Sequence, residues 1–106
     1  MRLQDKVIVV TGGADGIGFA LAAGIAREGA TAVIADIDQE KLECSKHALR
    51  ASGLSCEGYC MDVSRREEID RVVSDLLHRF GRIDGWVNNA GGFGKEIPAG
   101  NNRAGI

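Results

Sequence analysis

The sequence predicts an α/β fold in which a doubly wound parallel sheet lies between two layers of helices. Short runs of apolar, mostly β-branched residues recur along the 106-residue chain and indicate strands that are buried on both faces. Segments with apolar residues at helical spacing separate these runs, and the connections are short. This alternation implies right-handed crossovers and therefore parallel strands.

The first strand and the first helix are close neighbours in the chain. Residues 6–11 contain four consecutive β-branched residues, Val7 to Val10, which is typical of a strand buried on both faces. From Gly16 onward the apolar residues follow helical spacing: Ile17, Leu21 and Ile25. Gly29 is a suitable end for this helix, because glycine adopts the left-handed conformation that often follows a last turn.

A second strand, a second helix and a third strand come next. The segment Thr-Ala-Val-Ile-Ala-Asp at 31–36 predicts a short buried strand. Asp38 can cap a second helix, which ends at Gly53. That helix carries two spaced leucines, Leu42 and Leu49. A third strand is expected within 55–63, and it is weaker because Gly58 interrupts it.

The third helix has the clearest apolar pattern in the chain. Ser64-Arg65-Arg66-Glu67 has the form of a capping box, and Gly81 would end the helix. The apolar face consists of five residues: Ile69, Val72, Val73, Leu76 and Phe80. A fourth strand is expected over 83–88, where the sequence is Ile-Asp-Gly-Trp-Val-Asn.

These elements predict a Rossmann-like, three-layer arrangement with four strands in the order 3-2-1-4. The first two helices should cover one face of the sheet and the third helix the other. Residues 1–92 are expected to form this α/β unit, and the chain ends before a fifth strand. Residues 93–106 hold the single proline but show no convincing periodicity, so they predict a loop or tail.

Three glycines lie between the first strand and the first helix: Gly12, Gly16 and Gly18. A turn this tight needs backbone angles that a Cβ would oppose, and Gly18 would let the helix pack close to the strand. Without side chains a pyrophosphate can approach the backbone, where the helix N-terminus offers free N–H donors. The alternative is a tight turn with no ligand, but the acid at the end of the second strand favours a dinucleotide site.

That acid is Asp36, eighteen residues after Gly18. Its carboxylate can accept hydrogen bonds from the adenosine ribose, and it would repel a 2′-phosphate as a like charge. Asp15, within the glycine turn, adds a second negative group where no lysine or arginine is present to hold a phosphate. Both residues favour NAD over NADP. The alternative for Asp36 is a strand-end acid that faces only water.

Further candidate residues end the second, third and fourth strands. Ile37 follows the ribose-binding candidate directly, and Asp62-Val63 could offer a carboxylate and an apolar contact to an adenine ring. The alternative for this pair is a turn acid beside a core valine. Asn88 and Asn89 can tie neighbouring strand ends together, while the small residues Ala90-Gly91 would leave room for a cofactor.

These segments together resemble the short-chain dehydrogenase/reductase family. Thr11 to Gly18 matches the pattern T-G-x-x-x-G-x-G, and the later landmarks occur in the family's order: Asp36, Asp62-Val63 and Asn88-Asn89-Ala90-Gly91. The resemblance implies that Gly12 to Gly18 hold the pyrophosphate and Asp36 the adenosine ribose. It also implies that Asp62 and Val63 flank adenine and that Asn89 to Gly91 line a cofactor ribose. The implied reaction is NAD(H)-dependent oxidation of an alcohol or reduction of a ketone.

The resemblance does not extend to the family's catalytic residues. The family uses a serine and a Tyr-x-x-x-Lys pair from the second half of its subunit, whereas the single tyrosine here, Tyr59, is followed four residues later by Val63. No catalytic residue is therefore assigned, and the chain corresponds to less than half of a typical member. The prediction is the NAD(H)-binding portion of such an enzyme, inactive alone and able to use a substrate only if the missing half is supplied.

Other functions remain open at this point. The chain could be a stand-alone nucleotide-binding or interaction module, or one part of a split enzyme completed by a second polypeptide. A methyltransferase that binds S-adenosylmethionine also begins with a glycine-rich turn, but Asn88-Asn89-Ala90-Gly91 argues against it. The predicted fourth strand has one unpaired edge, which could mediate self-association.

Composition excludes several classes of partner and site. The net charge is −2 and the basic residues are scattered, so neither nucleic acid nor a membrane surface is expected as a partner. No signal peptide or membrane-spanning segment is recognisable, and a cytoplasmic location is expected. The three cysteines are predicted to be free thiols, and their spacing predicts no zinc site: Cys44, Cys56 and Cys60.

Overall fold

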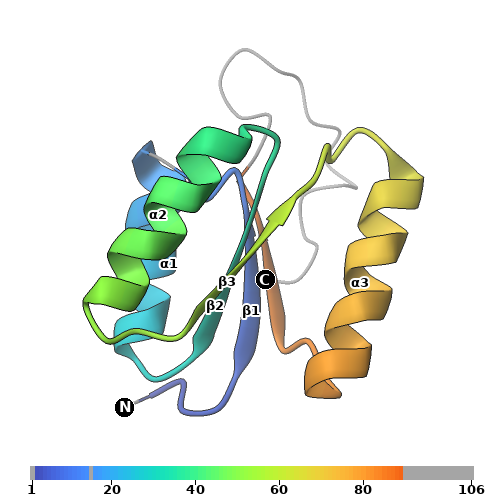
Figure 1. The fold of residues 1–106 in the computed structure, drawn as a ribbon. Helices are drawn as coiled ribbons and strands as arrows, with labels where there is room; N and C mark the ends of the chain where they lie inside the picture. The colour runs from blue at the N-terminus through green and yellow to red at the C-terminus, as the bar shows by residue number, and fades with distance from the viewer. Residues whose placement is uncertain (1, 15, 90–106) are drawn as a thin grey trace.

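The computed structural model describes residues 2–14 and 16–89, which form a parallel sheet between two helical layers (Figure 1). The elements in chain order are β1 (Val7–Thr11), α1 (Gly16–Arg27), β2 (Thr31–Asp36), α2 (Gln39–Ala51), β3 (Cys56–Cys60), α3 (Arg66–Phe80) and β4 (Gly85–Asn88). The sheet has four strands in the order β3-β2-β1-β4, which confirms the predicted order. The proposed boundary at residue 92 lies outside the described residues.

The two central strands are the most buried part of the molecule. Every residue of β1 is buried, and β2 is buried at its four middle positions. In register, Val9 of β1 lies opposite Val33 of β2 on one side and Trp86 of β4 on the other. Consecutive apolar residues suit these strands because helices cover both faces of the sheet.

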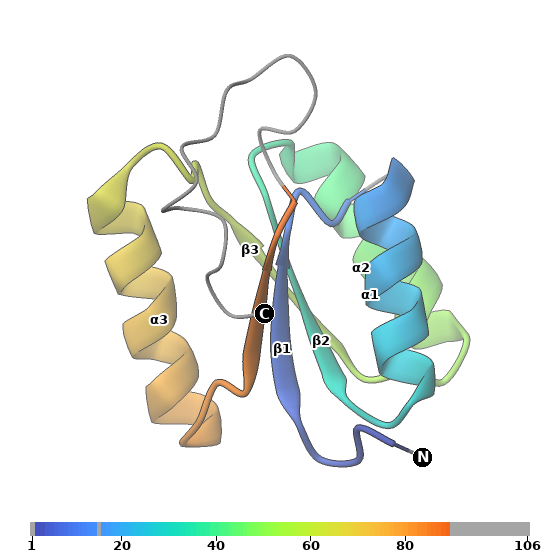
Figure 2. The same cartoon turned by 180° about the vertical axis from the view of Figure 1, so that it is seen from behind.

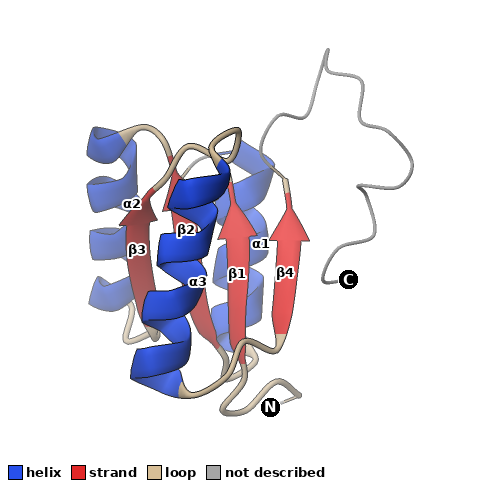
Figure 3. Ribbon diagram, turned by 90° about the vertical axis from the view of Figure 1, so that its right-hand side faces the viewer, coloured by secondary structure: helices blue, strands red, loops and turns tan. Residues whose placement is uncertain are grey.

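The helices divide the apolar core into two parts, one on each face of the sheet. Helices α1 and α2 cover one face, and α3 covers the other, as Figures 2 and 3 show. The core beneath α1 and α2 includes Val10, Ala22, Ile34, Leu42 and Leu49. The core beneath α3 includes Val9, Val33, Met61, Val72 and Leu76. The predicted assignment of helices to faces is therefore confirmed.

The predicted helix ends agree with the structure at Asp38 and at the glycines that follow the three helices, and they differ at the start of α3. Asp38 is the N-cap of α2 and accepts from the Lys41 backbone N–H at 3.1 Å, and Gly81 ends α3 with φ of 79°. The predicted capping box before α3 is wrong, because the N-cap is Arg65 and it makes no side-chain cap hydrogen bond. The Ser64 hydroxyl donates instead to the Asp62 carboxylate at 2.7 Å. Ser64 therefore belongs to a turn that precedes the helix.

The two outer strands are shorter than their apolar patterns indicate. Strand β4 begins two residues later than expected, because the Asp84 carboxylate accepts from the Val7 backbone N–H at 2.8 Å. The Asp84 N–H also donates to the Val7 carbonyl at 2.7 Å. In β3, a Cβ at Gly58 would lie 3.1 Å from Leu42 Cδ1. The glycine expected to weaken this strand therefore lets α2 pack closely on it.

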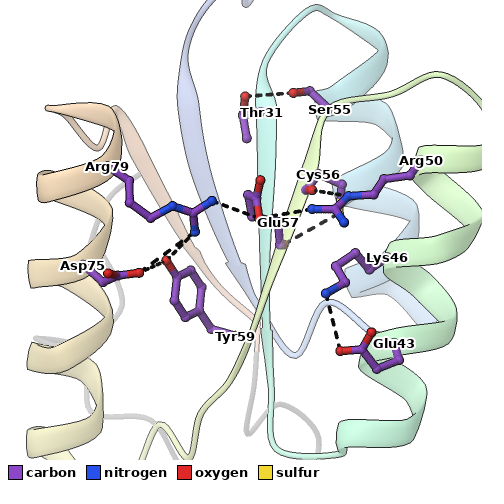
Figure 4. Close-up of polar contacts among 10 residues, drawn as sticks. All are labelled: Thr31, Glu43, Lys46, Arg50, Ser55, Cys56, Glu57, Tyr59, Asp75 and Arg79. Atoms are coloured by element: carbon purple, nitrogen blue, oxygen red, sulfur yellow. Dashed lines mark hydrogen bonds and ion pairs between the residues drawn. The ribbon is translucent and has the colours of Figure 1, made fainter.

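Charged side chains surround the outer edge of β3 (Figure 4). The Glu57 carboxylate pairs with Arg50 of α2 at 3.1 Å and with Arg79 of α3 at 3.2 Å. Arg50 Nε also donates to the Cys56 carbonyl at 2.9 Å. Because α2 and α3 cover opposite faces, these contacts pass around the edge strand from both sides.

The outer edge of β4 has no partner strand within the described residues. Its residues are half-buried except Asn88, which is exposed, and Trp86 packs at the margin of the core beneath α3. Unpaired edges favour association. We therefore expect the 106-residue chain to associate through β4 as its concentration rises, with light scattering as the measurement. A constant monomer mass over the whole concentration range would contradict this expectation.

No helix in the described part of the chain is long and apolar enough to cross a membrane.

Candidate functional site

The glycine turn connects β1 to α1 at the carboxyl edge of the sheet. Gly12 and Gly16 have φ of 66° and 59°, in the left-handed region that favours glycine. The prediction that these positions need angles a Cβ would oppose is confirmed. A Cβ at Gly16 would meet no atom within 4 Å, so the backbone here is open to an approaching group.

At Gly18 a glycine is required because the surrounding atoms leave no space for a side chain. A Cβ at this position would lie 2.0 Å from the Gly12 carbonyl oxygen and 2.8 Å from Asn89 Nδ2. The predicted close approach is present, but its partners are the turn and Asn89 rather than the strand itself. Gly13, which lies within the predicted pyrophosphate turn, is also confined: its Cβ would lie 3.0 Å from the Val10 carbonyl oxygen.

Asp36 ties the end of β2 to the glycine turn. One carboxylate oxygen accepts from the Ala14 backbone N–H at 3.1 Å, and the other accepts from the Asp38 backbone N–H at 3.0 Å. Each oxygen can accept a further hydrogen bond. The side chain is half-buried, so Asp36 is not simply a strand-end acid that faces water.

A cavity of about 290 Å³ lies beside this carboxylate, at the carboxyl ends of β1, β2 and β3. Its volume is near the lower limit of small-molecule sites, which is roughly 300 Å³. The residues that line it are Gly12, Ala35, Asp36, Ile37, Met61, Asp62 and Val63. Five residues selected from separate parts of the sequence therefore border one cavity.

Asp62 supplies a second carboxylate to the cavity. The Ser64 side chain, the Ser64 backbone N–H and the nearby charge of Arg65 hold the pKa of Asp62 below its usual range. The group is therefore ionised at neutral pH and can only accept hydrogen bonds. The Glu68 carboxylate accepts from the Asp62 backbone N–H at 2.9 Å. This bond ties the backbone of Asp62 to the first turn of α3.

The two asparagines join the end of β4 to the end of β1. Asn89 Nδ2 donates to the Gly12 carbonyl at 3.2 Å, and the Asn89 backbone N–H donates to Thr11 Oγ1 at 2.9 Å. The Thr11 hydroxyl lies 3.3 Å from Asn88 Oδ1. The predicted role in tying strand ends is therefore confirmed. Three other candidates lie outside the described residues: Asp15, Ala90 and Gly91.

The Tyr59 hydroxyl makes hydrogen bonds to side chains of α3 (Figure 4). Its hydroxyl donates to the Asp75 carboxylate and accepts from Arg79 Nη1 at 2.9 Å. Burial and the bond to Asp75 raise the pKa of this tyrosine. Tyr59 does not line the cavity.

All three cysteines are free thiols, as predicted: Cys44, Cys56 and Cys60. Burial raises the pKa of the Cys56 thiol to about 11, so this group remains protonated at neutral pH. Within residues 2–14 and 16–89, no group of three or more His, Cys, Asp and Glu side chains is placed to hold a metal ion.

Sequence reasoning missed Ser45 of α2. Its side chain is buried, and its hydroxyl donates to the Ala14 carbonyl in the glycine turn. A signal was present, because Ser45 is three residues after Leu42 and four before Leu49. Helical spacing places a polar residue at that position on the apolar face, where it needs a hydrogen-bond partner.

Comparison with known proteins gives a consistent assignment. The family model described as short chain dehydrogenase matches residues 6–103. A levodione reductase from Leifsonia aquatica is 40% identical over 99 residues, which is 92% of this chain. The chain spans 37% of the length of that relative.

Solved structures resemble this chain at the level of the fold. An NAD⁺-bound xylitol dehydrogenase has 31% identity and a TM-score of 0.76 over 81% of this chain and 33% of its own. A metagenomic short-chain oxidoreductase in complex with NADP has 36% identity and a TM-score of 0.82 over 86% of this chain and 41% of its own.

The strand order and the two helical layers define a Rossmann-type α/β protein. The chain belongs to the short-chain dehydrogenase family, whose members are oxidoreductases that use nicotinamide cofactors.

Proposed function

We propose that this chain is the NAD(H)-binding portion of a short-chain dehydrogenase/reductase that interconverts an alcohol and a ketone. The observation that carries the proposal is the cavity beside the glycine turn, which Asp36 and Asp62 border from two different strand ends. Asp36 would accept from the adenosine ribose hydroxyls, and Asp62, Val63 and Ile37 would contact the adenine. The substrate pocket would come from a further part of the protein.

The pyrophosphate would lie over Gly12 to Gly18, at the N-terminus of α1. Two observations support this placement: the open space at Gly16, and the N–H groups at a helix start, which attract anions. Asn89, Ala90 and Gly91 would line the cofactor ribose. When bound, the cofactor supplies hydride transfer, and the residues of this chain bind and orient it.

The cofactor preference gives a direct test. We expect NAD to bind more than about tenfold more tightly than NADP, because a 2′-phosphate would approach the Asp36 carboxylate as a like charge. The two solved relatives hold NAD⁺ in one case and NADP in the other, so membership of the family does not decide the preference. Calorimetric titration with both nucleotides measures it, and Asp36→Ala should narrow the difference.

Asp38→Ala is the matched control for that variant. Asp38 caps α2 and does not border the cavity, so its loss should reduce stability without changing the NAD-to-NADP ratio. Tighter binding of NADP than of NAD by the unchanged chain would contradict the proposed role of Asp36.

The cytoplasmic location expected from the sequence stays a prediction.

A further inference from the structure

Both backbone polar groups of Ala14 are held by side chains that come from later elements. The Ala14 N–H donates to Asp36 Oδ2 at the end of β2, at 3.1 Å. The Ala14 carbonyl accepts from Ser45 Oγ in α2. Ala14 and Ser45 are 4% and 7% exposed, so water competes little for the bond between them, while the bond to Asp36 is part-buried.

These two bonds fix the conformation of the turn at one residue. The N–H belongs to the peptide plane before Ala14 and the carbonyl to the plane after it. Holding both planes therefore restricts both backbone torsion angles of Ala14. Gly13 is packed against the Val10 carbonyl on one side, and α1 begins at Gly16 on the other. The clamped residue thus lies between a packed glycine and the first N–H groups of the helix.

The bond made by Ser45 is unusual for a serine in a helix. A helical serine commonly returns its hydroxyl to a carbonyl one turn earlier, and Ser52, the C-cap of α2, makes the same kind of bond to Ala48 at 3.3 Å. Ser45 instead donates to a carbonyl 31 residues earlier in the chain. Its hydroxyl therefore connects the second helix to the turn that precedes the first.

We propose that Ser45 is a positioning residue for the cofactor phosphates, acting through the Ala14 carbonyl, and that Asp36 holds the same turn while it binds the ribose. This inference rests on the proposed function. A turn held before the ligand arrives need not lose conformational freedom on binding, so the clamp raises affinity for groups at the helix N-terminus. Ser45 touches neither the adenosine cavity nor, in this proposal, the cofactor itself.

The test separates ligands with a pyrophosphate from a ligand without one. Calorimetry on the 106-residue chain would use NAD, ADP and adenosine. Ser45→Ala should weaken NAD and ADP binding by about tenfold, the loss expected for one buried hydrogen bond, and leave adenosine binding unchanged. Ser52→Ala, at the C-cap of α2, is the matched control and should change none of the three.

A second variant guards against a failure of Ser45→Ala to fold. Ser45→Cys is nearly isosteric but carries a weaker donor, so it should stay folded and lose part of the affinity for NAD and ADP. Equal weakening of adenosine and ADP would overturn the inference, because it would mean a general loosening of α2. Unchanged NAD binding in Ser45→Ala would overturn the inference about Ser45 and leave the proposed function standing. Failure of the unchanged chain to bind NAD would overturn the proposed function as well.

Discussion

Replacing Gly18 with alanine is expected to lower the free energy of unfolding by about 3 kcal/mol or more and to abolish NAD binding. The backbone at Gly18 does not have a positive φ, so an alanine could adopt its conformation. The added methyl group would, however, lie 2.0 Å from the Gly12 carbonyl oxygen. A backbone oxygen cannot move aside as a flexible side chain can, so α1 must move away from the turn. Thermal unfolding and calorimetry measure the two effects.

Gly24 in the same helix provides a matched control. A Cβ at Gly24 would meet no atom within 4 Å, so Gly24→Ala adds a methyl group to open space. Alanine is favoured over glycine in a helix by about 1 kcal/mol, and this variant should be slightly more stable than the unchanged chain. If Gly18→Ala and Gly24→Ala had the same stability and affinity, the described contact between α1 and the turn would be wrong.

The 106-residue chain is expected to show no dehydrogenase turnover with any alcohol or ketone. Its sequence holds no Tyr-x-x-x-Lys pair, and the single tyrosine is bonded to Asp75 and Arg79 on the α3 side of the sheet. Hydride transfer to a ketone also needs a proton for the oxygen, and the sequence lacks the tyrosine–lysine pair that the family uses to supply it. The measurement is NADH absorbance with chain of confirmed mass.

Three outcomes would distinguish the alternatives for this chain. Steady NADH consumption by the chain alone would show that the active site has been misassigned. Turnover that begins only when a second polypeptide is added would support a split enzyme. Tight NAD binding without turnover under either condition would leave the stand-alone nucleotide-binding module as the simplest interpretation.

The fold was predictable because its signals are local. The unbroken apolar run in β1, the helical spacing in α3 and the glycines at helix ends each determine the conformation of a few neighbouring residues. The strand order 3-2-1-4 is the one that Rossmann-type folds adopt, and the right-handed crossovers then assign the helices to the two faces. The positions of the candidate site residues were predictable from the fold. Parallel strands place their carboxyl ends at one edge of the sheet, which brings Asp36 and Asp62 together.

What sequence reasoning missed depends on contacts between distant segments. Ser45 is a helical serine until α2 is placed against the turn, and Gly13 is confined only after β2 has paired with β1. The wrong capping box is a local exception, because the carboxylate of Asp62, two residues before Ser64, accepts the Ser64 hydroxyl and so removes it from the helix N-terminus. A pattern of residue types predicts which groups need partners, but the packing decides which partners they obtain.

The charged contacts around β3 have a consequence for how copies of this chain can assemble. Carbonyls alternate in direction along a strand. The Ser55 carbonyl points toward β2 and accepts from the Ala32 N–H, so the next carbonyl, that of Cys56, points away from the sheet. There it accepts a hydrogen bond from Arg50 Nε. Arg50 and the charged side chains around Glu57 therefore disfavour a new strand at that margin, while the margin at β4 has no partner strand within residues 2–14 and 16–89. A further strand is therefore expected to add to the sheet only beside β4. Two chains that meet through β4 present only their β3 edges to a third chain. Association should stop at a twofold pair instead of continuing into a filament.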